Sequence, residues 1–244
     1  SSMDEVPHAQ EHYRERLLAL PERPVCYFPA NTPTQQKTRA DFGLSAQKHL
    51  YLCPMTPYKL HPEMDDLFGA ILRADAAGEI VFVSNAQTEL WTRLKQRFGR
   101  TLPDVVGRLR FLPFMPMTDF VELLRLADVL LDTTKFNGGT TSLEAFAVGT
   151  PIVTLPGEVL RQRTTYTMYN AMDLFDCVAK DQADYVRLAT EIAGRAEYRD
   201  NLKQEILARN AVLYGQTAWV KPLSDFLLQA LATPASSQKT GVSL

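Results

Sequence analysis

Residues 127–157 read ADVLLDTTKFNGGTTSLEAFAVGTPIVTLPG, and this stretch decides the fold. It contains two short apolar runs, 129–131 and 152–154, separated by a glycine-rich turn and a helical pattern. Buried parallel strands have short, continuous apolar runs of this kind, and a helix connects one such strand to the next. The stretch therefore predicts two parallel strands joined by a crossover helix.

The same alternation continues on both sides of this stretch. Apolar runs bounded by Pro, Gly, Asp or Ser predict the following strands: Leu50–Cys53, Ile80–Val83, Leu109–Leu112, Val129–Leu131 and Ile152–Thr154. Apolar spacing predicts the following helices: Glu63–Ala74, Thr88–Phe98, Thr118–Leu126, Ser142–Val148, Ala183–Ala193, Arg199–Leu213 and Ala218–Leu231. We therefore expect an α/β fold, a Rossmann-like, doubly wound parallel sheet flanked by helices, with further helices at the C-terminus.

The two ends of the chain differ in composition from this centre. His8–Leu20 has the pattern of an amphipathic helix, and Pro29–Thr38 is polar and carries two prolines, as linkers do. The last dozen residues are rich in Ser, Thr and Ala. We expect an N-terminal helix and linker over residues 1–35, one Rossmann-like domain over 36–232, and a flexible tail over 233–244.

Composition excludes several classes of protein. The 244 residues are 45% hydrophobic and 22% charged, enough for one well-packed core. A net charge of −2 creates no field that would recruit nucleic acid or an anionic membrane. The apolar stretches are too short to cross a bilayer and no signal-type segment leads the chain, so we expect a cytoplasmic protein. Cys26, Cys53 and Cys177 are widely separated, which argues against a disulfide framework or a zinc site.

The glycine-rich turn is the first of two loops that carry chemical groups. Gly138 and Gly139 lack a Cβ, so phosphates can approach the backbone, and Thr140 and Thr141 add hydroxyl donors to the free N–H groups of a helix start. Glu144, one turn further on, is placed to accept hydrogen bonds from a ribose. The turn also fits a plain threonine N-cap. It matches neither G-x-G-x-x-G nor the Walker spacing, which disfavours a dehydrogenase or a P-loop NTPase.

The second loop, MTPYKLHP over residues 55–62, follows the first predicted strand. Lys59 precedes a helix that begins near Pro62, and its ammonium group could stabilise the charge that develops on a diphosphate leaving group. The alternative is an ordinary solvated lysine. Ligands of doubly wound sheets bind where the strands end, so we expect both loops at the same edge of the sheet.

Residues 127–157 resemble the nucleotide-sugar half of the O-GlcNAc transferase/SPINDLY family, and the resemblance extends over about residues 11–231. These enzymes have the GT-B architecture, in which two Rossmann-like domains face each other across a cleft. The resemblance implies that Lys59 contacts the donor diphosphate and is needed for activity. It also implies that Thr56 touches the phosphates.

The resemblance implies further contacts with the donor. It places recognition of the base by backbone groups around Met115, with Met117 near the base, and Arg163 matches an arginine common in the family. The chain also departs from the O-GlcNAc transferases, which have His at the position of Gly139 and Lys and His where this chain has Met117 and Phe120. Such differences can change which base and sugar are selected. The Gly-Gly turn is closer to the bacterial SPINDLY-like branch, whose plant relatives use GDP-fucose.

The resemblance implies a glycosyltransferase domain that binds a nucleotide-sugar, with UDP-GlcNAc favoured, for inverting, metal-independent transfer to Ser or Thr of proteins. A GDP-fucose-using domain, a non-catalytic nucleotide-binding module and a sugar-nucleotide epimerase are the alternatives. The resemblance implies that no metal or other cofactor is needed, and the sequence agrees, since the chain has no DxD motif and the adjacent pair Asp65–Asp66 is expected on a solvated helix face.

The expected partners are the nucleotide-sugar donor and a protein acceptor. A GT-B enzyme needs two Rossmann-like domains, and five predicted strands supply only one. No 34-residue periodicity indicates the tetratricopeptide helices of the family. We therefore expect that the full-length enzyme contains an N-terminal GT-B domain or tetratricopeptide region that is missing here.

Overall fold

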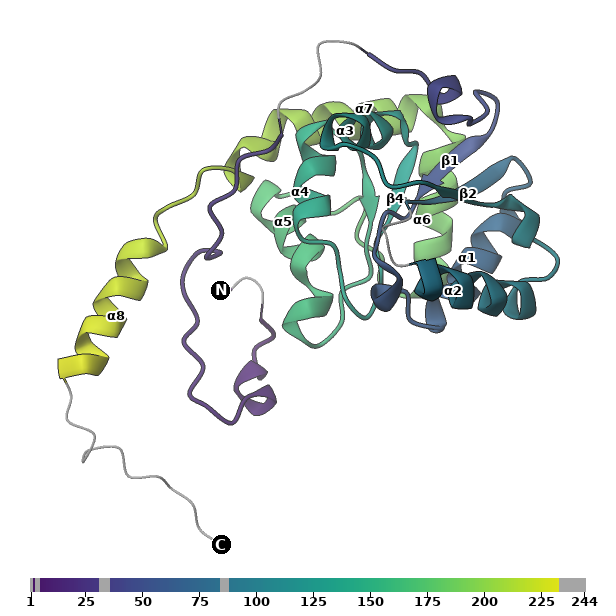
Figure 1. Ribbon diagram of the computed structural model, residues 1–244. Coiled ribbons are helices and arrows are strands. Elements are labelled where there is room, and N and C mark those ends of the chain that lie inside the picture. Colours follow the sequence, from purple (N-terminus) through teal and green to yellow (C-terminus); the bar gives the residue numbers. More distant parts are fainter. Residues whose placement is uncertain (1, 3–4, 31–35, 84–87, 233–244) are drawn as a thin grey trace, which may run out of the picture.

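The computed structural model describes residues 2, 5–30, 36–83 and 88–232, and it contains one parallel sheet (Figure 1). The expectations for residues 31–35 and 233–244 lie outside the described residues. The strands are β1 His49–Leu52, β2 Gly78–Val83, β3 Leu109–Leu112, β4 Val129–Leu131 and β5 Ile152–Val153. All five predicted strands are confirmed, with ends that shift by two residues or fewer.

The strand order is β3-β2-β1-β4-β5, and every pairing is parallel. Tyr51 of β1 lies beside Ile80 of β2 on one side and beside Val129 of β4 on the other. The chain first builds the sheet outward from β1 to β3 and then returns to add β4 on the opposite side. The order therefore reverses between β1 and β4, which is where sheets of this kind bind ligands.

Helices flank the sheet (Figure 1). The longer ones are α1 Glu63–Ala74, α2 Thr88–Thr101, α3 Met117–Leu126, α4 Thr140–Ala147, α5 Thr164–Met172, α6 Gln182–Gly194, α7 Ala196–Arg209 and α8 Val220–Ala232. Short 3-10 turns are η1 Ala9–His12, η2 Arg39–Phe42, η3 Pro57–Lys59, η4 Val106–Arg108, η5 Leu160–Gln162 and η6 Asn210–Leu213. Each helix predicted between β1 and β5 is confirmed, whereas α5 had no specific prediction.

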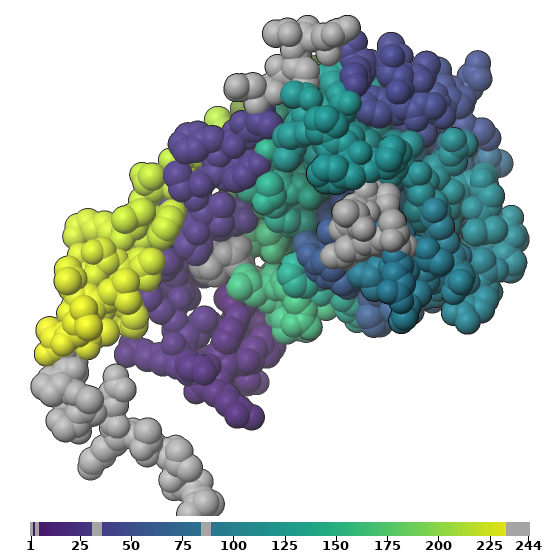
Figure 2. Space-filling view, viewed as in Figure 1, coloured from purple at the N-terminus to yellow at the C-terminus, as the bar shows by residue number. Residues whose placement is uncertain are grey.

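The helix predicted over His8–Leu20 is wrong. Only the single 3-10 turn η1 forms there, and Leu18 is 40% exposed. The side chain of Gln10 instead bonds with the backbone of Tyr13, Glu15 and Leu17. A short isolated helix is marginal in water unless its apolar face packs on something, and of residues 8–20 only Ala9 and Leu20, near the two ends, are buried. In the space-filling view the N-terminal segment lies between α8 and the rest of the molecule (Figure 2).

Aromatic side chains fill the core between β2, α1 and α2. Their rings pack in edge-on and stacked pairs with centroids 5.2–6.1 Å apart, and they are Phe68, Phe82, Trp91, Phe98 and Phe111. Such pairs add to the stabilisation that comes from burial itself. They fix α1 and α2 against β2, and thereby fix the start of α1 just beyond β1.

The expectation that Asp65–Asp66 lies on a solvated face is wrong for Asp65. Asp66 is exposed, but Asp65 is buried between α1 and α2. The Asp65 carboxylate accepts hydrogen bonds from Arg97 Nε at 3.0 Å and Nη2 at 2.8 Å, and from Thr101 Oγ1 at 2.9 Å. A partner 32 residues away therefore allows a charge to be buried on the face that packs against α2.

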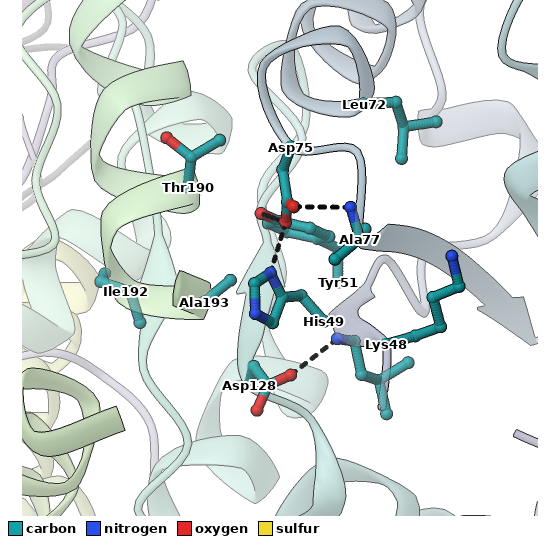
Figure 3. A network of polar contacts seen from close by, with 12 residues as sticks. Lys48, His49, Tyr51, Leu72, Asp75, Ala77, Asp128, Thr190, Ile192 and Ala193 are labelled. Atoms are coloured by element: carbon teal, nitrogen blue, oxygen red, sulfur yellow. Dashed lines mark hydrogen bonds and ion pairs between the residues drawn. The ribbon is translucent and has the colours of Figure 1, made fainter. Parts of the chain in front are cut away.

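Two carboxylates hold the amino ends of the strands (Figure 3). Asp75 accepts hydrogen bonds from Tyr51 Oη and His49 Nδ1, both at 2.7 Å, and Asp128 accepts one from the backbone N–H of Leu50 at 2.7 Å. Burial opposes ionisation of Asp75, but the bonds from Tyr51 and His49 outweigh it and hold the pKa of Asp75 below its usual value. These hydrogen bonds connect the strands at the amino edge of the sheet. The candidate site lies in the loops at the opposite, carboxyl edge.

Replacing Arg97 with Met should lower the free energy of unfolding by about 3 kcal/mol, because Asp65 would remain buried without its cation. Chemical denaturation measures this change. Arg93→Met is the control on the same helix, because Arg93 pairs with Glu89 on the exposed surface, and it should change stability by about 0.5 kcal/mol or less. Equal effects of the two variants would contradict the structural role given to the buried pair.

Candidate functional site

The loops that follow β1 and β4 meet at the carboxyl edge of the sheet, as the sequence predicts. Lys59, in η3 after β1, extends its side chain to the loop after β4. Its Nζ donates a hydrogen bond to the carbonyl oxygen of Asn137 at 2.8 Å and lies 4.3 Å from the centroid of the Phe136 ring. The amine is therefore held directly beside the glycine-rich turn.

Two adjoining hollows open at this edge. The polar hollow has a volume of about 310 Å³ and is lined by Pro54, Met55, Thr56, Tyr58, Lys59, Gly139, Thr140 and Thr141. The apolar hollow has a volume of about 330 Å³ and is lined by Pro54, Thr56, Val83, Phe114, Met115, Pro116, Met117 and Phe120. Both hollows include Pro54 and Thr56, so these two residues form the wall between them. Seven of the ten predicted site residues line one hollow or both.

The start of α4 gives the polar hollow its anion-binding character. Gly139 occupies the N-cap position, and no side chain caps the helix, so the expected alternative of a threonine N-cap is wrong. The N–H groups of the first turn and the hydroxyls of Thr140 and Thr141 are thus left at a wall that already carries an ammonium group. Backbone N–H groups and the positive end of the helix dipole favour a bound anion at such a position.

The two glycines of the turn have different roles. A Cβ on Gly139 would meet no atom within 4 Å, so this residue leaves the hollow open. Gly138 is buried under the turn, where a Cβ would collide with Ser142 Oγ and come within 2.8 Å of Met55 Cε. Gly138 therefore allows the turn to pack tightly, and it does not line either hollow.

Lys59 is not fully solvated, and it forms no ion pair with any of the described residues. Its side chain is half-buried, and burial lowers its pKa, although the nearby charge of Asp132 opposes this shift. The carbonyl of Asn137 and the ring of Phe136 each engage the ammonium group. An ammonium group has three N–H donors, so at least one remains for a ligand in the polar hollow. This geometry disfavours the expected alternative of an ordinary surface lysine.

Asp132, which follows β4, was not predicted as a site residue. It is buried, and its Oδ1 accepts hydrogen bonds from the N–H groups of Gly138 at 2.8 Å and Thr133 at 3.0 Å. Its Oδ2 accepts a hydrogen bond from Thr154 Oγ1 at 2.8 Å. Burial raises the pKa of Asp132 to about 6, and these bonds limit the rise. Its place directly after a buried strand is the signal in the sequence that could have identified it.

Thr56 stands on the wall between the hollows with an unsatisfied group. Its Oγ1 is buried and has no hydrogen-bond partner among the described residues. Buried hydroxyls are normally paired, so an unpaired one beside a cavity suggests that a ligand supplies the missing partner. This observation supports the predicted contact of Thr56 with phosphates.

The apolar hollow is lined mainly by hydrophobic side chains. Phe114 is 75% exposed and Met117 is 50% exposed at its surface, whereas Phe120 is half-buried and packs on the core. Large exposed apolar side chains around a cavity are typical of a ligand-binding surface. Phe114 and Tyr58, which is 69% exposed at the polar hollow, were both missed by sequence reasoning.

Glu144 and Arg163 line neither hollow. The buried Glu144 carboxylate accepts hydrogen bonds from the hydroxyl of Tyr27 and from the N–H of Ala30 at 3.1 and 3.2 Å. The predicted contact of Glu144 with a ribose stays a prediction. Arg163 Nη1 donates to the carbonyl of Gly157 at 3.0 Å, and its guanidinium group lies 4.7 Å from the ring of Tyr166.

Within the described ranges, no group of three His, Cys, Asp or Glu side chains is arranged to hold a metal ion. Nor does any helix in those ranges have the length and apolar character required to span a bilayer.

Asp132 should give the stability of the fold a recognisable pH dependence. Because its pKa in the folded protein is about 6 and the usual value is 3.8, the folded state binds the proton more tightly than the unfolded state between those values. The contribution of Asp132 to the free energy of unfolding is therefore at its maximum below about pH 4, falls by about 3 kcal/mol in all as the pH rises to about 7, and is flat above. Asp132→Asn should gain stability relative to the wild type over that range, measured by urea denaturation.

Asp104→Asn is the control of opposite sign. The hydrogen bond from Arg73 lowers the pKa of this exposed carboxylate below 3.8, so the wild type should gain relative to Asp104→Asn as the pH rises to about 5 and should stay level from there to about pH 7. If both variants show the same trend with pH, the assignment to Asp132 is wrong.

Comparison with known proteins agrees with the fold and identifies the family. The family model of glycosyl transferase family 41 matches residues 31–219. A UDP-N-acetylglucosamine--peptide N-acetylglucosaminyltransferase of Giardia intestinalis is 26% identical over 193 residues, which are 76% of this chain and 12% of that protein. A probable transferase of the same name from Hordeum vulgare, SPINDLY, is 24% identical over 228 residues, 88% of this chain and 23% of that protein.

Among solved structures, a mutant of the Thermobaculum terrenum O-GlcNAc transferase superposes with a TM-score of 0.73 at 24% identity. The match covers 93% of this chain and 43% of that one, and at this identity it shows the fold alone. The chain thus spans less than a quarter of the length of these two curated relatives. Because the family model covers most of the sequence, this chain belongs to glycosyl transferase family 41.

Proposed function

We propose that this chain is the donor-binding part of a glycosyltransferase that uses a nucleotide-sugar, with UDP-GlcNAc as the favoured donor and Ser or Thr of a protein as acceptor. The observation that carries the proposal is the position of the Lys59 ammonium group beside the uncapped start of α4. This places a cation and free N–H groups around one hollow, with an apolar hollow directly next to it. A nucleoside diphosphate has the same two parts, an anionic diphosphate and a largely apolar base face.

In this proposal the two hollows divide the donor between them. The diphosphate lies in the polar hollow, where it accepts hydrogen bonds from Lys59, Thr140 and Thr141. The base lies in the apolar hollow near Met115 and Met117. The unsatisfied hydroxyl of Thr56, between the hollows, donates to a phosphate oxygen. Because the two hollows adjoin, one donor molecule can occupy both of them.

The proposed chemistry is stabilisation of the leaving group. When the acceptor hydroxyl attacks the anomeric carbon and the glycosidic bond to the diphosphate breaks, negative charge grows on the departing diphosphate. Lys59 and the dipole of α4 would neutralise that charge, which is the role that a divalent cation has in other transferases. One displacement of this kind inverts the anomeric centre. We therefore propose metal-independent, inverting transfer.

The acceptor site and the catalytic base are proposed to lie on a part of the enzyme outside this chain. The family resemblance and the 43% coverage of the Thermobaculum terrenum structure both favour a second domain that completes the cleft.

Membership of the family also supports GDP-fucose as the second candidate donor. The specific observation in its favour is the open position at Gly139, where O-GlcNAc transferases carry His.

Isothermal titration calorimetry with UDP, GDP, UDP-GlcNAc and GDP-fucose tests the proposal. We expect UDP and UDP-GlcNAc to bind most tightly, with unchanged affinity when EDTA replaces magnesium. A preference for GDP and GDP-fucose would instead select the second candidate. If none of the four ligands binds, the proposed function is wrong.

Replacing Lys59 with Met should weaken UDP binding by about 2 kcal/mol, or roughly thirtyfold in Kd, because a charge-assisted bond to the diphosphate is lost. Lys48→Met is the matched control, since Lys48 precedes β1 at the opposite edge of the sheet (Figure 3), and it should leave the affinity unchanged. Uridine, which lacks the diphosphate, should bind both variants equally. An unaltered UDP affinity in Lys59→Met would favour a nucleotide-binding module that does not use this lysine.

A further inference from the structure

A third hollow lies at the amino edge of the sheet, opposite the candidate site. Its volume is about 190 Å³, and it is bounded by η2, the end of α3, the turn before β5 and the first turns of α7. Six of the residues around it are charged: Arg39, Arg125, Asp128, Arg199, Asp200 and Lys203. Four cations and two carboxylates leave this hollow with an excess of positive charge.

Two of the carboxylates nearby, Asp128 and Glu122, are engaged by arginines, whereas Asp200 lines the hollow and acts on Lys203 only through its charge. Asp128 pairs with Arg39 Nη2 at 2.8 Å and with Arg199 Nη1 at 3.3 Å. Glu122 pairs with Arg125 Nη2 at 2.7 Å. These pairs neutralise much of the arginine charge. They leave Lys203 without an ion pair to any of the described residues.

Lys203 is the cation that the protein itself does not satisfy. No carboxylate among the described residues lies within 4.0 Å of its amine, whose one hydrogen bond is a long one, 3.4 Å, to the carbonyl of Arg125. The side chain is half-buried and packs so tightly against the turn at Gly149 that a Cβ there would lie 2.9 Å from Lys203 Cγ. Burial lowers the pKa of Lys203, and the charges of Arg125 and Arg199 lower it further, while the charge of Asp200 partly opposes this shift. A half-buried ammonium group with one weak partner is unfavourable unless an anion joins it.

We propose that this hollow binds a phosphate-sized oxyanion, either free or as the end of a phosphate monoester. Lys203 Nζ would be its central donor. Arg125 and Arg199 line the same hollow, and Arg125 Nη1 and Arg199 Nη2 make no hydrogen bond to the described part of the chain, so these two groups can complete the set. The guanidinium and ammonium groups together match the tetrahedral oxygens of a phosphate.

This oxyanion site is separate from the proposed donor site. Lys203 and Lys59 belong to hollows at opposite edges of the sheet, and the two hollows share no lining residue. Their occupancy can therefore be tested separately, and neither proposal depends on the other.

The test uses inorganic phosphate as the probe, in a Lys59→Met background so that phosphate binding in the polar hollow is suppressed. Calorimetry in a phosphate-free buffer, with chloride at matched ionic strength as the reference, should show one saturable site. Lys59→Met/Lys203→Met should bind phosphate at least about tenfold more weakly. It should also have a higher melting temperature in the absence of phosphate, because an unfavourably buried charge has been removed.

Lys59→Met/Lys221→Met is the matched control, because Lys221 is exposed on α8 and pairs with Asp225, and its phosphate affinity should be unchanged. Lys59→Met/Lys203→Gln provides a second neutral side chain and should lose phosphate affinity as Lys59→Met/Lys203→Met does.

Phenyl phosphate separates the two sources of the ligand. Binding of both probes indicates the end of a monoester, and binding of inorganic phosphate alone indicates the free ion. Equal phosphate affinity with and without Lys203, or no saturable binding at all, overturns the proposal.

Discussion

The buried carboxylate of Asp132 is the constraint on which the candidate site depends. It stands at the end of β4, next to the point where the strand order reverses, and its oxygens hold the N–H of Gly138 and the hydroxyl of Thr154. Each of these donors would be buried and unpaired without it, at a cost of about 1–3 kcal/mol. Its negative charge also favours the protonated form of Lys59. One side chain thus positions the turn and supports the cation that faces it.

The sheet and the meeting of the two loops could be predicted because they depend on patterns that are local in the sequence. Buried parallel strands are continuous apolar runs, and the turn residues that end them are equally visible. The rule that parallel strands end at one edge then brings Lys59 and Thr140 together without any knowledge of side-chain contacts. Family resemblance added the functional interpretation of Lys59, which local chemistry alone left as a choice between a ligand contact and a solvated side chain.

What could not be predicted depends on partners that are distant in the sequence. Asp65 can be buried because Arg97 lies across the helix interface, and the residues next to Asp65 in the sequence do not indicate that partner. The segment around His8–Leu20 has an amphipathic pattern, but only Ala9 and Leu20 of its residues are buried, so periodicity alone was misleading there. Phe114 shows a similar difficulty, because an exposed aromatic residue is informative only once the hollow beside it is known.

The N-terminal segment bears directly on the predicted contact of Glu144 with a ribose. Glu144 is one helical turn from Thr140, yet its carboxylate accepts hydrogen bonds from Tyr27 and Ala30. The raised pKa of the Tyr27 hydroxyl, caused first by burial and then by its bond to Glu144, keeps that hydroxyl a donor at neutral pH. A carboxylate oxygen has more than one lone pair, so these bonds leave acceptor capacity on Glu144. A ribose contact would therefore require the segment around Tyr27 to share Glu144 with the ligand or to move away from it.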